Sequence, residues 1–241
     1  MKIVQIISGG MDSVTLLYHL KNEGHEVSTL SFNYGQKHNK ELGYVAYHTN
    51  KLNVHHKIVD LTAITDLLSK DSVLINKDIK VPTGHYENPI MKSTIVPNRN
   101  MMMLSVAGCW ALSLKYDTLA FGAHFGDNAI YPDCRESFIK SMEKSFELCD
   151  WHKLKLITPF KNMLKEDIAK IGGKLNLDYS KTWTCYRGEE IQCGECATCI
   201  ERREALYNAN ITDITEYSTK YTLEELVEKN WLKPKAINEI I

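Results

Sequence analysis

The feature that most constrains the fold is a short glycine-containing loop near the start of the chain. The β-branched run at residues 2–7 is followed by SGGMDS at residues 8–13, and apolar residues then recur at helical spacing up to Gly24. This pattern predicts a strand, a tight loop and a helix. Because short strands continue to alternate with helices, we predict an α/β fold in which a parallel twisted sheet has helices on both faces.

Further elements follow from the apolar pattern. Strands are predicted at residues 27–32, 57–61, 118–121 and 154–157, and helices at about 40–52, 99–114, 135–148, 165–175, from 201 onward and at 223–229. Residues 69–93 and 122–134 lack periodicity and are predicted to be loops, which at such lengths are usually functional. We expect residues 1–180 to form the α/β domain, residues 181–207 a small cysteine-containing segment and residues 208–241 a helical C-terminal extension.

Composition excludes several classes of protein. The chain has 241 residues, of which 44% are hydrophobic and 24% charged, as in ordinary globular proteins. It has no run of 18 apolar residues and no signal-peptide pattern, so we expect a cytoplasmic protein without a membrane partner. The formal net charge of −1 does not favour direct nucleic-acid binding, and small-molecule substrates are expected instead.

The SGGMDS loop has the chemistry of an anion site. Glycines let a ligand approach the backbone, and free N–H groups at the start of a helix attract phosphate oxygens. Asp12 would repel phosphate unless it holds a divalent cation or caps the helix. The loop lacks the lysine of a Walker A motif and the spacing of a dinucleotide site. The predicted nucleotide-binding residues are Ser8, Gly9, Gly10, Met11, Asp12 and Ser13.

Four of the seven cysteines lie close together in the sequence, at Cys185, Cys193, Cys196 and Cys199. In a reducing compartment such clustering indicates metal binding more often than disulfides. Four thiolates suit a tetrahedral zinc ion with no open position, so we predict one structural zinc ion that contributes to folding. An iron–sulfur cluster or a redox pair remains an alternative for the same residues.

Several motifs together resemble one enzyme family. SGGMDS resembles the loop of the PP-loop ATP pyrophosphatase superfamily, whose members adenylate a substrate and release pyrophosphate. YGQKH at residues 34–38, STIVPNRN at 93–100, YPDCR at 131–135 and the cysteine segment occur in an order similar to that of the 7-cyano-7-deazaguanine synthase family, over about residues 3–207. Asn98 stands where that family usually has glycine, and asparagine tolerates a left-handed backbone better than most residues.

The resemblance implies an ATP-dependent ligase that converts 7-carboxy-7-deazaguanine and ammonia into the nitrile by way of an amide, for a modified base of tRNA or DNA. Transfer of AMP to a carboxyl oxygen makes that oxygen a leaving group. The resemblance also implies Mg²⁺ with ATP, and a homodimer. The alternatives are another PP-loop pyrophosphatase, such as a tRNA-thiolating enzyme, or a nucleotide-binding zinc module that regulates a partner.

The same resemblance suggests three catalytic residues, Asp12, Arg99 and Lys165. Arg99 is a planar donor for a phosphate or for the substrate carboxylate. Lys165 resembles the lysine that the superfamily directs at the departing phosphates, with a solvated helix lysine as the alternative. The sequence therefore places one acidic and two basic side chains around the expected nucleotide.

Substrate contacts are expected from Arg99, Tyr131 and Asp133. The Asp133 carboxylate would accept hydrogen bonds from the guanine-like edge, and Tyr131 would stack on the ring. The alternative for Asp133 is a turn residue that caps the following helix. Tyr34 and His38 are weaker candidates, and His38 is expected to be solvated.

Overall fold

In the computed structural model of the protein, which describes residues 1–68 and 71–235, five parallel strands form one sheet. The strands are β1 (Lys2–Ile6), β2 (Glu26–Asn33), β3 (His55–Asp60), β4 (Thr118–Ala120) and β5 (Lys155–Ile157). Their spatial order is β3-β2-β1-β4-β5. In register, Ile3 of β1 lies opposite Val27 of β2 and Thr118 of β4. The predicted parallel sheet is confirmed.

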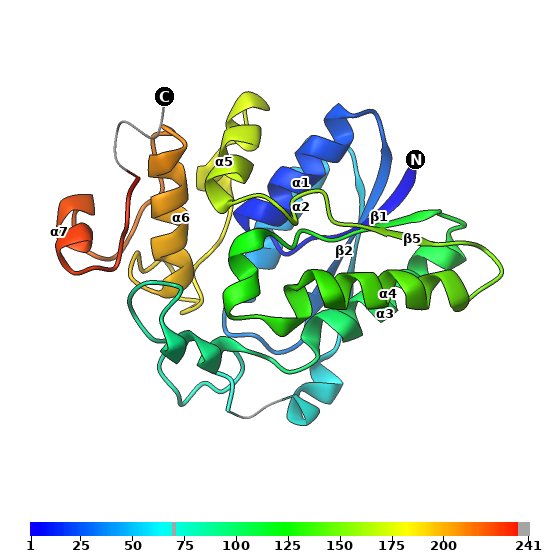
Figure 1. The fold of residues 1–241 in the computed structure, drawn as a ribbon, viewed down its shortest axis with the longest axis horizontal. Coiled ribbons are helices and arrows are strands. Elements are labelled where there is room, and N and C mark those ends of the chain that lie inside the picture. Colours follow the sequence, from blue (N-terminus) through cyan, green and yellow to red (C-terminus); the bar gives the residue numbers. More distant parts are fainter. Residues whose placement is uncertain (69–70, 236–241) are drawn as a thin grey trace.

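Helices cover both faces of this sheet, as predicted (Figure 1). They are α1 (Met11–Asn22), α2 (Glu41–Lys51), α3 (Arg99–Ser113), α4 (Glu136–Leu148), α5 (Lys165–Lys174), α6 (Ala197–Asn208) and α7 (Leu223–Glu228). The helix expected from residue 201 begins earlier, because Cys196 is its N-cap. The predicted loop at 69–93 also contains a short 3₁₀ helix, Pro89–Thr94, which lacks a periodic signal because it is too short.

The core divides into two apolar clusters, one on each face of the sheet. Val4 of β1 packs in one cluster with Leu104 of α3, whereas Ile3 packs in the other with Leu17 of α1. Successive strand residues point to opposite faces, so a sheet covered on both faces requires the continuous apolar runs seen in the sequence. Each fully buried aliphatic side chain stabilises the fold by about 1.5–3 kcal/mol.

The strand order creates a crevice at the carboxyl end of the sheet. From β1 the chain passes through α1 to β2 on one side, and after β3 it crosses to β4 on the other side of β1. The loops that follow β1 and β4 therefore diverge, and such a switch point is where open α/β sheets bind ligands. The SGGMDS loop follows β1 at this place, and residues 121–134 follow β4.

The C-terminal part lies at one end of the sheet. Helix α6 packs beside α5 (Figure 1). Helix α7 and the residues that follow it contact α6 through a small cluster of Ile200, Leu226 and Leu232. Apolar contacts and hydrogen bonds join the segments on either side of residues 180 and 207. The domain boundaries expected at these two positions therefore stay predictions.

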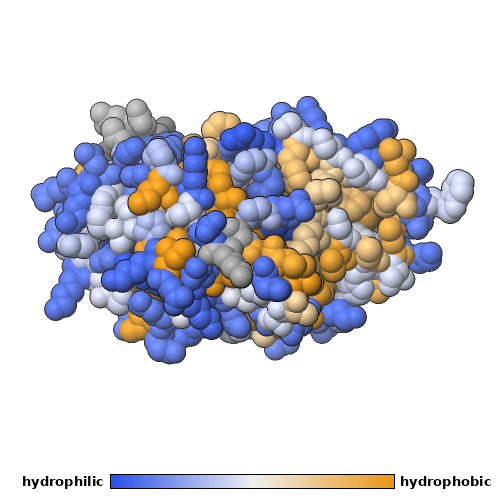
Figure 2. All heavy atoms as spheres, turned by 90° about the horizontal axis from the view of Figure 1, so that it is seen from below, coloured by the Kyte–Doolittle hydropathy of each residue, from blue (hydrophilic) through white to orange (hydrophobic). Residues whose placement is uncertain are grey.

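The surface differs between the two ends of the molecule. Figure 2 shows that the end formed by the C-terminal part is mainly hydrophilic, whereas hydrophobic surface gathers toward the sheet end. Exposed large apolar side chains on or after α3 and α4 include Met101, Leu148 and Trp151. Among the described helices, none combines the length and the hydropathy needed to cross a membrane.

Candidate active site and metal centre

The SGGMDS loop forms the turn from β1 into α1. Gly9 has a φ of +93°, and a Cβ atom there would lie 2.3 Å from the carbonyl oxygen of Glu41, so glycine is required. Gly10 is the N-cap of α1 and provides no side-chain cap, which leaves the first N–H groups of the helix free for an anion. Ser13 Oγ lies 3.2 Å from Ser8 Oγ. The Met11 side chain is buried in the core, so only its backbone can contact a ligand.

Two adjoining cavities meet at this loop. The first, of about 220 Å³, lies toward the sheet and is called the sheet-side cavity; Ile6, Phe32, Tyr34, Arg99 and Phe121 are among the residues that line it. The second, of about 150 Å³, is called the helix-side cavity, and its lining includes Lys165, Thr184, Thr198 and Glu201. Both cavities are lined by Ser8, Gly10, Asp12, Glu41, Asp127, Tyr131 and Tyr186.

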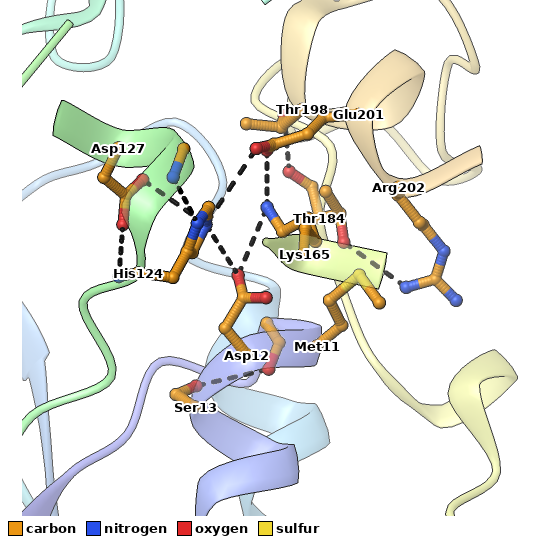
Figure 3. A network of polar contacts seen from close by, with 12 residues as sticks. Met11, Asp12, Ser13, His124, Asp127, Lys165, Thr184, Thr198, Glu201 and Arg202 are labelled. Atoms are coloured by element: carbon orange, nitrogen blue, oxygen red, sulfur yellow. Dashed lines mark hydrogen bonds and ion pairs between the residues drawn. The ribbon is translucent and has the colours of Figure 1, made fainter. Parts of the chain in front are cut away.

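Asp12 and Lys165 both line the helix-side cavity, and their side chains point toward one another (Figure 3). Lys165 Nζ lies 3.2 Å from Asp12 Oδ2 and 2.5 Å from Glu201 Oε2. The Lys165 side chain is only 10% exposed, so it is not a solvated helix lysine. Burial alone would lower the pKa of Lys165, but the carboxylates of Asp12 and Glu201 outweigh burial and hold that pKa well above its usual range.

His124 approaches the same carboxylates from the loop after β4 (Figure 3). Its Nδ1 accepts a 3.1 Å hydrogen bond from the Gly126 N–H, which places the proton of the neutral ring on Nε2. Nε2 lies 3.9 Å from Asp12, 3.6 Å from Asp127 and 3.9 Å from Glu201. His124, Asp127 and Glu201 were not among the residues predicted from the sequence. The first two lie in the loop that follows the predicted strand at 118–121, and this position could have indicated a role at the ligand-binding edge of the sheet.

Arg99 begins α3 and lines the sheet-side cavity. Its Nη1 donates a 3.5 Å hydrogen bond to the Tyr34 hydroxyl, and within residues 1–68 and 71–235 it forms no ion pair with a carboxylate. The preceding Asn98 has a φ of +60°, the left-handed conformation that the sequence anticipated. A guanidinium that faces a cavity without an anionic partner is suited to bind a phosphate or a carboxylate.

Glu41 and His38 form a buried polar pair beside Arg99. His38 Nε2 lies 3.6 Å from Glu41 Oε1. Burial raises the pKa of Glu41 to about 8, although the hydrogen bond from Gln36 acts to lower that pKa. Burial, together with the charge of Arg99, lowers the pKa of His38 to about 3. The expectation that His38 is solvated is wrong, because its ring packs against that of Tyr186. The two ring centroids are 5.3 Å apart.

Of the remaining predicted substrate contacts, the structure brings Tyr131 to the cavities but not Asp133. The Tyr131 hydroxyl lies 2.7 Å from Thr94 Oγ1 and 3.3 Å from the Tyr186 hydroxyl. Asp133 lines neither cavity, and its Oδ2 accepts a 3.1 Å hydrogen bond from the Asn100 N–H in the first turn of α3. Asp133 also does not cap α4, whose N-cap is Arg135.

The four clustered cysteines meet in space. Each contributes a buried sulfur atom that lies within 4.8 Å of the other three. The sulfur atoms of Cys193 and Cys199 are 3.9 Å apart, near the separation of about 3.8 Å between ligands placed 2.3 Å from a tetrahedral ion. The backbone N–H groups of Glu195 and Cys196 donate to Cys193 Sγ, which favours a thiolate there. The residues therefore fit a metal ion with four sulfur ligands.

Comparisons with known proteins place most of the chain in one family. The family model described as "Queuosine biosynthesis protein QueC" matches residues 2–210. A protein of Caldicellulosiruptor saccharolyticus named 7-cyano-7-deazaguanine synthase is 50% identical over 217 residues, which cover 90% of this chain and 96% of that protein. A protein of the same name from Methanoregula boonei is 48% identical over 217 residues, which cover 90% of this chain and 99% of that protein.

Among solved structures, NMN synthetase from Francisella tularensis matches with a TM-score of 0.51 at 11% identity, over 95% of this chain and 83% of that one. At that identity the likeness concerns the fold alone. The two chains therefore share an α/β fold.

Proposed function

The chain belongs to the QueC family of queuosine biosynthesis proteins, and we propose that it is an ATP-dependent 7-cyano-7-deazaguanine synthase. One observation carries the proposal beyond family membership. The free helix N-terminus at the SGGMDS loop lies where two cavities meet, with the Arg99 guanidinium in one and the buried Lys165 ammonium in the other. A triphosphate on the loop would therefore have its α-phosphate next to a second bound molecule.

In the first half-reaction, the 7-carboxylate of the substrate attacks the α-phosphate and pyrophosphate leaves. Loop N–H groups and the Lys165 ammonium compensate the negative charge that develops on the departing phosphates. Asp12 would hold the Mg²⁺ that accompanies ATP and shields its phosphates. Arg99 would orient the attacking carboxylate or the α-phosphate, since its donors face the sheet-side cavity without a competing carboxylate.

In the second half-reaction, ammonia displaces AMP from the acyl adenylate and gives the amide. A second adenylation, now of the amide oxygen, turns that oxygen into a leaving group, and loss of AMP with the amide protons leaves the nitrile. Tyr131 and Tyr186 line both cavities and offer ring surfaces against which a flat base can stack. With Asp133 turned to α3, the carboxyl groups that line both cavities are those of Asp12, Glu41 and Asp127.

The four cysteines would hold a structural zinc ion. Four sulfur ligands leave no position for a substrate, so the ion would stabilise the segment around α6 rather than take part in the reaction. We further propose a cytoplasmic location and a homodimer. The hydrophobic surface toward the sheet end offers an apolar face to a second copy (Figure 2). Trp151, in the segment between α4 and β5, is 99% exposed.

The proposal is tested by incubating the protein with Mg²⁺, ATP, an ammonium salt and 7-carboxy-7-deazaguanine, and by following the base by mass spectrometry. We expect the amide and then the nitrile, with AMP and pyrophosphate as co-products. Asp12→Ala and Ser13→Ala variants that fold should lose turnover. Pyrophosphate release only with another acceptor would favour a different PP-loop enzyme, and nucleotide binding without turnover would favour a regulatory module.

A further inference from the structure

Helix α6 begins inside the cysteine centre and reaches the helix-side cavity within two turns. Cys196 is its N-cap and Cys199 lies in its first turn. Glu201 follows directly, and its side chain, 11% exposed, lines the helix-side cavity and points toward Lys165 (Figure 3). One short helix therefore carries two of the four predicted metal ligands and a carboxylate of the nucleotide site.

The start of α6 is held in place by buried hydrogen bonds. The Arg202 guanidinium is fully buried and donates to Thr182 Oγ1 at 2.7 Å and to the Tyr179 carbonyl at 2.6 Å. Thr198 Oγ1 donates a 2.9 Å hydrogen bond to the Thr184 carbonyl. These contacts fix α6 against residues 179–184, so the Glu201 carboxylate has little freedom to follow Lys165 if the lysine moves.

Lys165 occupies a position that does not favour a cation. It is the first residue of α5, where the helix dipole places partial positive charge, and its side chain is buried. Four titratable groups face its ammonium: Asp12 and Glu201 in direct contact, with Asp127 and His124 beyond them. Asp12 belongs to the SGGMDS loop, and under the proposed function it would hold Mg²⁺ there. Glu201 is then the contacting carboxylate that remains.

We propose that Glu201 is a positioning residue that holds the Lys165 ammonium directed at the SGGMDS loop, so that the cysteine centre, through α6, orders the candidate nucleotide site. Glu201 acts through Lys165 and does not itself touch the reacting atoms. The inference rests on the proposed function only in assigning Lys165 to the phosphates. It gives the metal-binding segment a role in the active site in addition to its role in folding.

The first test measures the chemical state of Lys165 directly in the metal-loaded protein. We would treat the parent and Glu201→Gln with a trace of acetic anhydride at several pH values and quantify acetylation of the Lys165 peptide by mass spectrometry. Removing the carboxylate breaks the 2.5 Å contact that holds the amine in its buried ion pair, so we expect acetylation of Lys165 at pH 8 to rise at least about tenfold. Equal acetylation in both proteins would overturn the proposal.

A matched control lies one turn further along α6. Glu204 is also a buried carboxylate, but it accepts hydrogen bonds from the Tyr86 hydroxyl and the Lys233 N–H, away from Lys165. Glu204→Gln should leave the acetylation of Lys165 unchanged, and a rise equal to that in Glu201→Gln would indicate general loosening of α6 and count against the proposal. Glu201→Asp keeps the charge and should retain part of the protection.

The second test is a double-mutant cycle on pyrophosphate release. We expect Glu201→Gln to lower kcat by roughly 10-fold or more with a smaller change in the KM for ATP, and Lys165→Met to lower kcat further. If Glu201 acts through Lys165, the double variant equals Lys165→Met alone. Multiplied losses would show that Glu201 acts independently and would overturn the proposal.

The two proposals can fail separately. Acetylation of Lys165, and its protection by Mg²⁺ with ATP, do not depend on which acceptor the enzyme uses. A protein that does not convert 7-carboxy-7-deazaguanine but shows the Glu201-dependent change in acetylation would contradict the proposed function and support the positioning role. Conversion of the base with no Glu201-dependent change would support the proposed function and contradict the positioning role.

Discussion

The backbone N–H of Trp183 donates a 2.9 Å hydrogen bond to the carbonyl of Gly9, so the SGGMDS loop is joined directly to the segment that leads into the cysteine centre. The Trp183 indole is buried, and its Nε1 donates to the Cys185 carbonyl at 2.9 Å. Only one residue separates Trp183 from the first predicted metal ligand. The cysteine cluster and the SGGMDS loop are thus connected by backbone as well as by α6.

Removal of the metal should therefore weaken both folding and ATP binding. We expect about one zinc ion per chain by elemental analysis, and Cys196→Ser to lower the free energy of unfolding by on the order of 3 kcal/mol or more, since structural zinc binding contributes directly to folding. ATP affinity, measured by calorimetry, should fall in the same variant. Cys109→Ser, at an exposed cysteine outside the cluster, is the control. Stoichiometric iron, or unchanged stability after complete metal removal, would contradict this expectation.

Glycine at position 9 is required for two reasons that can be separated experimentally. Gly9 and Gly24 both have positive φ, but a Cβ at Gly24 meets no atom within 4 Å, whereas one at Gly9 would overlap the Glu41 carbonyl. Gly24→Ala should lower the free energy of unfolding by roughly 1–2 kcal/mol and keep ATP binding. Gly9→Ala should cost more and lose ATP binding. Equal free energies of unfolding for Gly9→Ala and Gly24→Ala, measured by urea titration, would argue against the close approach of residue 9 to the Glu41 carbonyl.

Stability should depend on pH through Glu41. Its pKa of about 8 lies above the ordinary value near 4.5, so the folded state binds an extra proton between these values and loses stability as pH rises through 8. Glu41→Gln lacks this titration. The Tm of the parent relative to Glu41→Gln should therefore fall by several degrees between pH 6 and pH 9, since about 1 kcal/mol shifts Tm by about 2–4 °C in a chain of this size. A constant difference in Tm would count against a buried neutral Glu41.

The position of Asp133 predicts a structural effect and no direct contact with the base. Asp133→Ala removes the acceptor for the Asn100 N–H and should lower the free energy of unfolding by about 1 kcal/mol, with a small rise in the KM for the base. Arg99→Met should instead leave the folded state at least as stable and reduce kcat/KM by about 100-fold or more, because a charge-assisted contact is lost. If Asp133→Ala lost base binding as strongly as Arg99→Met, that result would support the contact between Asp133 and the base that the sequence predicted.

Local sequence patterns were sufficient for the sheet, its helices and the binding loop. Residues 8–13 combine a glycine turn with a helix start, and both depend on neighbours within a few residues. The left-handed conformation of Asn98 was foreseen from the family resemblance, because glycine usually stands at that position. The four cysteines lie within one segment, so their meeting also required little knowledge of distant packing.

Residues whose role depends on distant packing could not be identified from the sequence. His38 lies in a polar loop, yet Tyr186, far along the chain, packs against it and buries it. Glu201 contacts Lys165 across 36 positions of sequence because α6 packs beside α5. Asp133 looked free to bind a base because nothing local indicated that the first turn of α3 lies beside it.

The guanidinium of Arg99 faces the sheet-side cavity and, among residues 1–68 and 71–235, forms no ion pair. Any small oxyanion of suitable size would be drawn there, so sulfate or phosphate buffers should behave as competitors of the natural ligands and raise the apparent Michaelis constants. The same buffers should also shift the melting curve upward, because an ion that binds only the folded chain displaces the equilibrium toward it. Affinities for this enzyme are therefore best compared at a fixed anion composition.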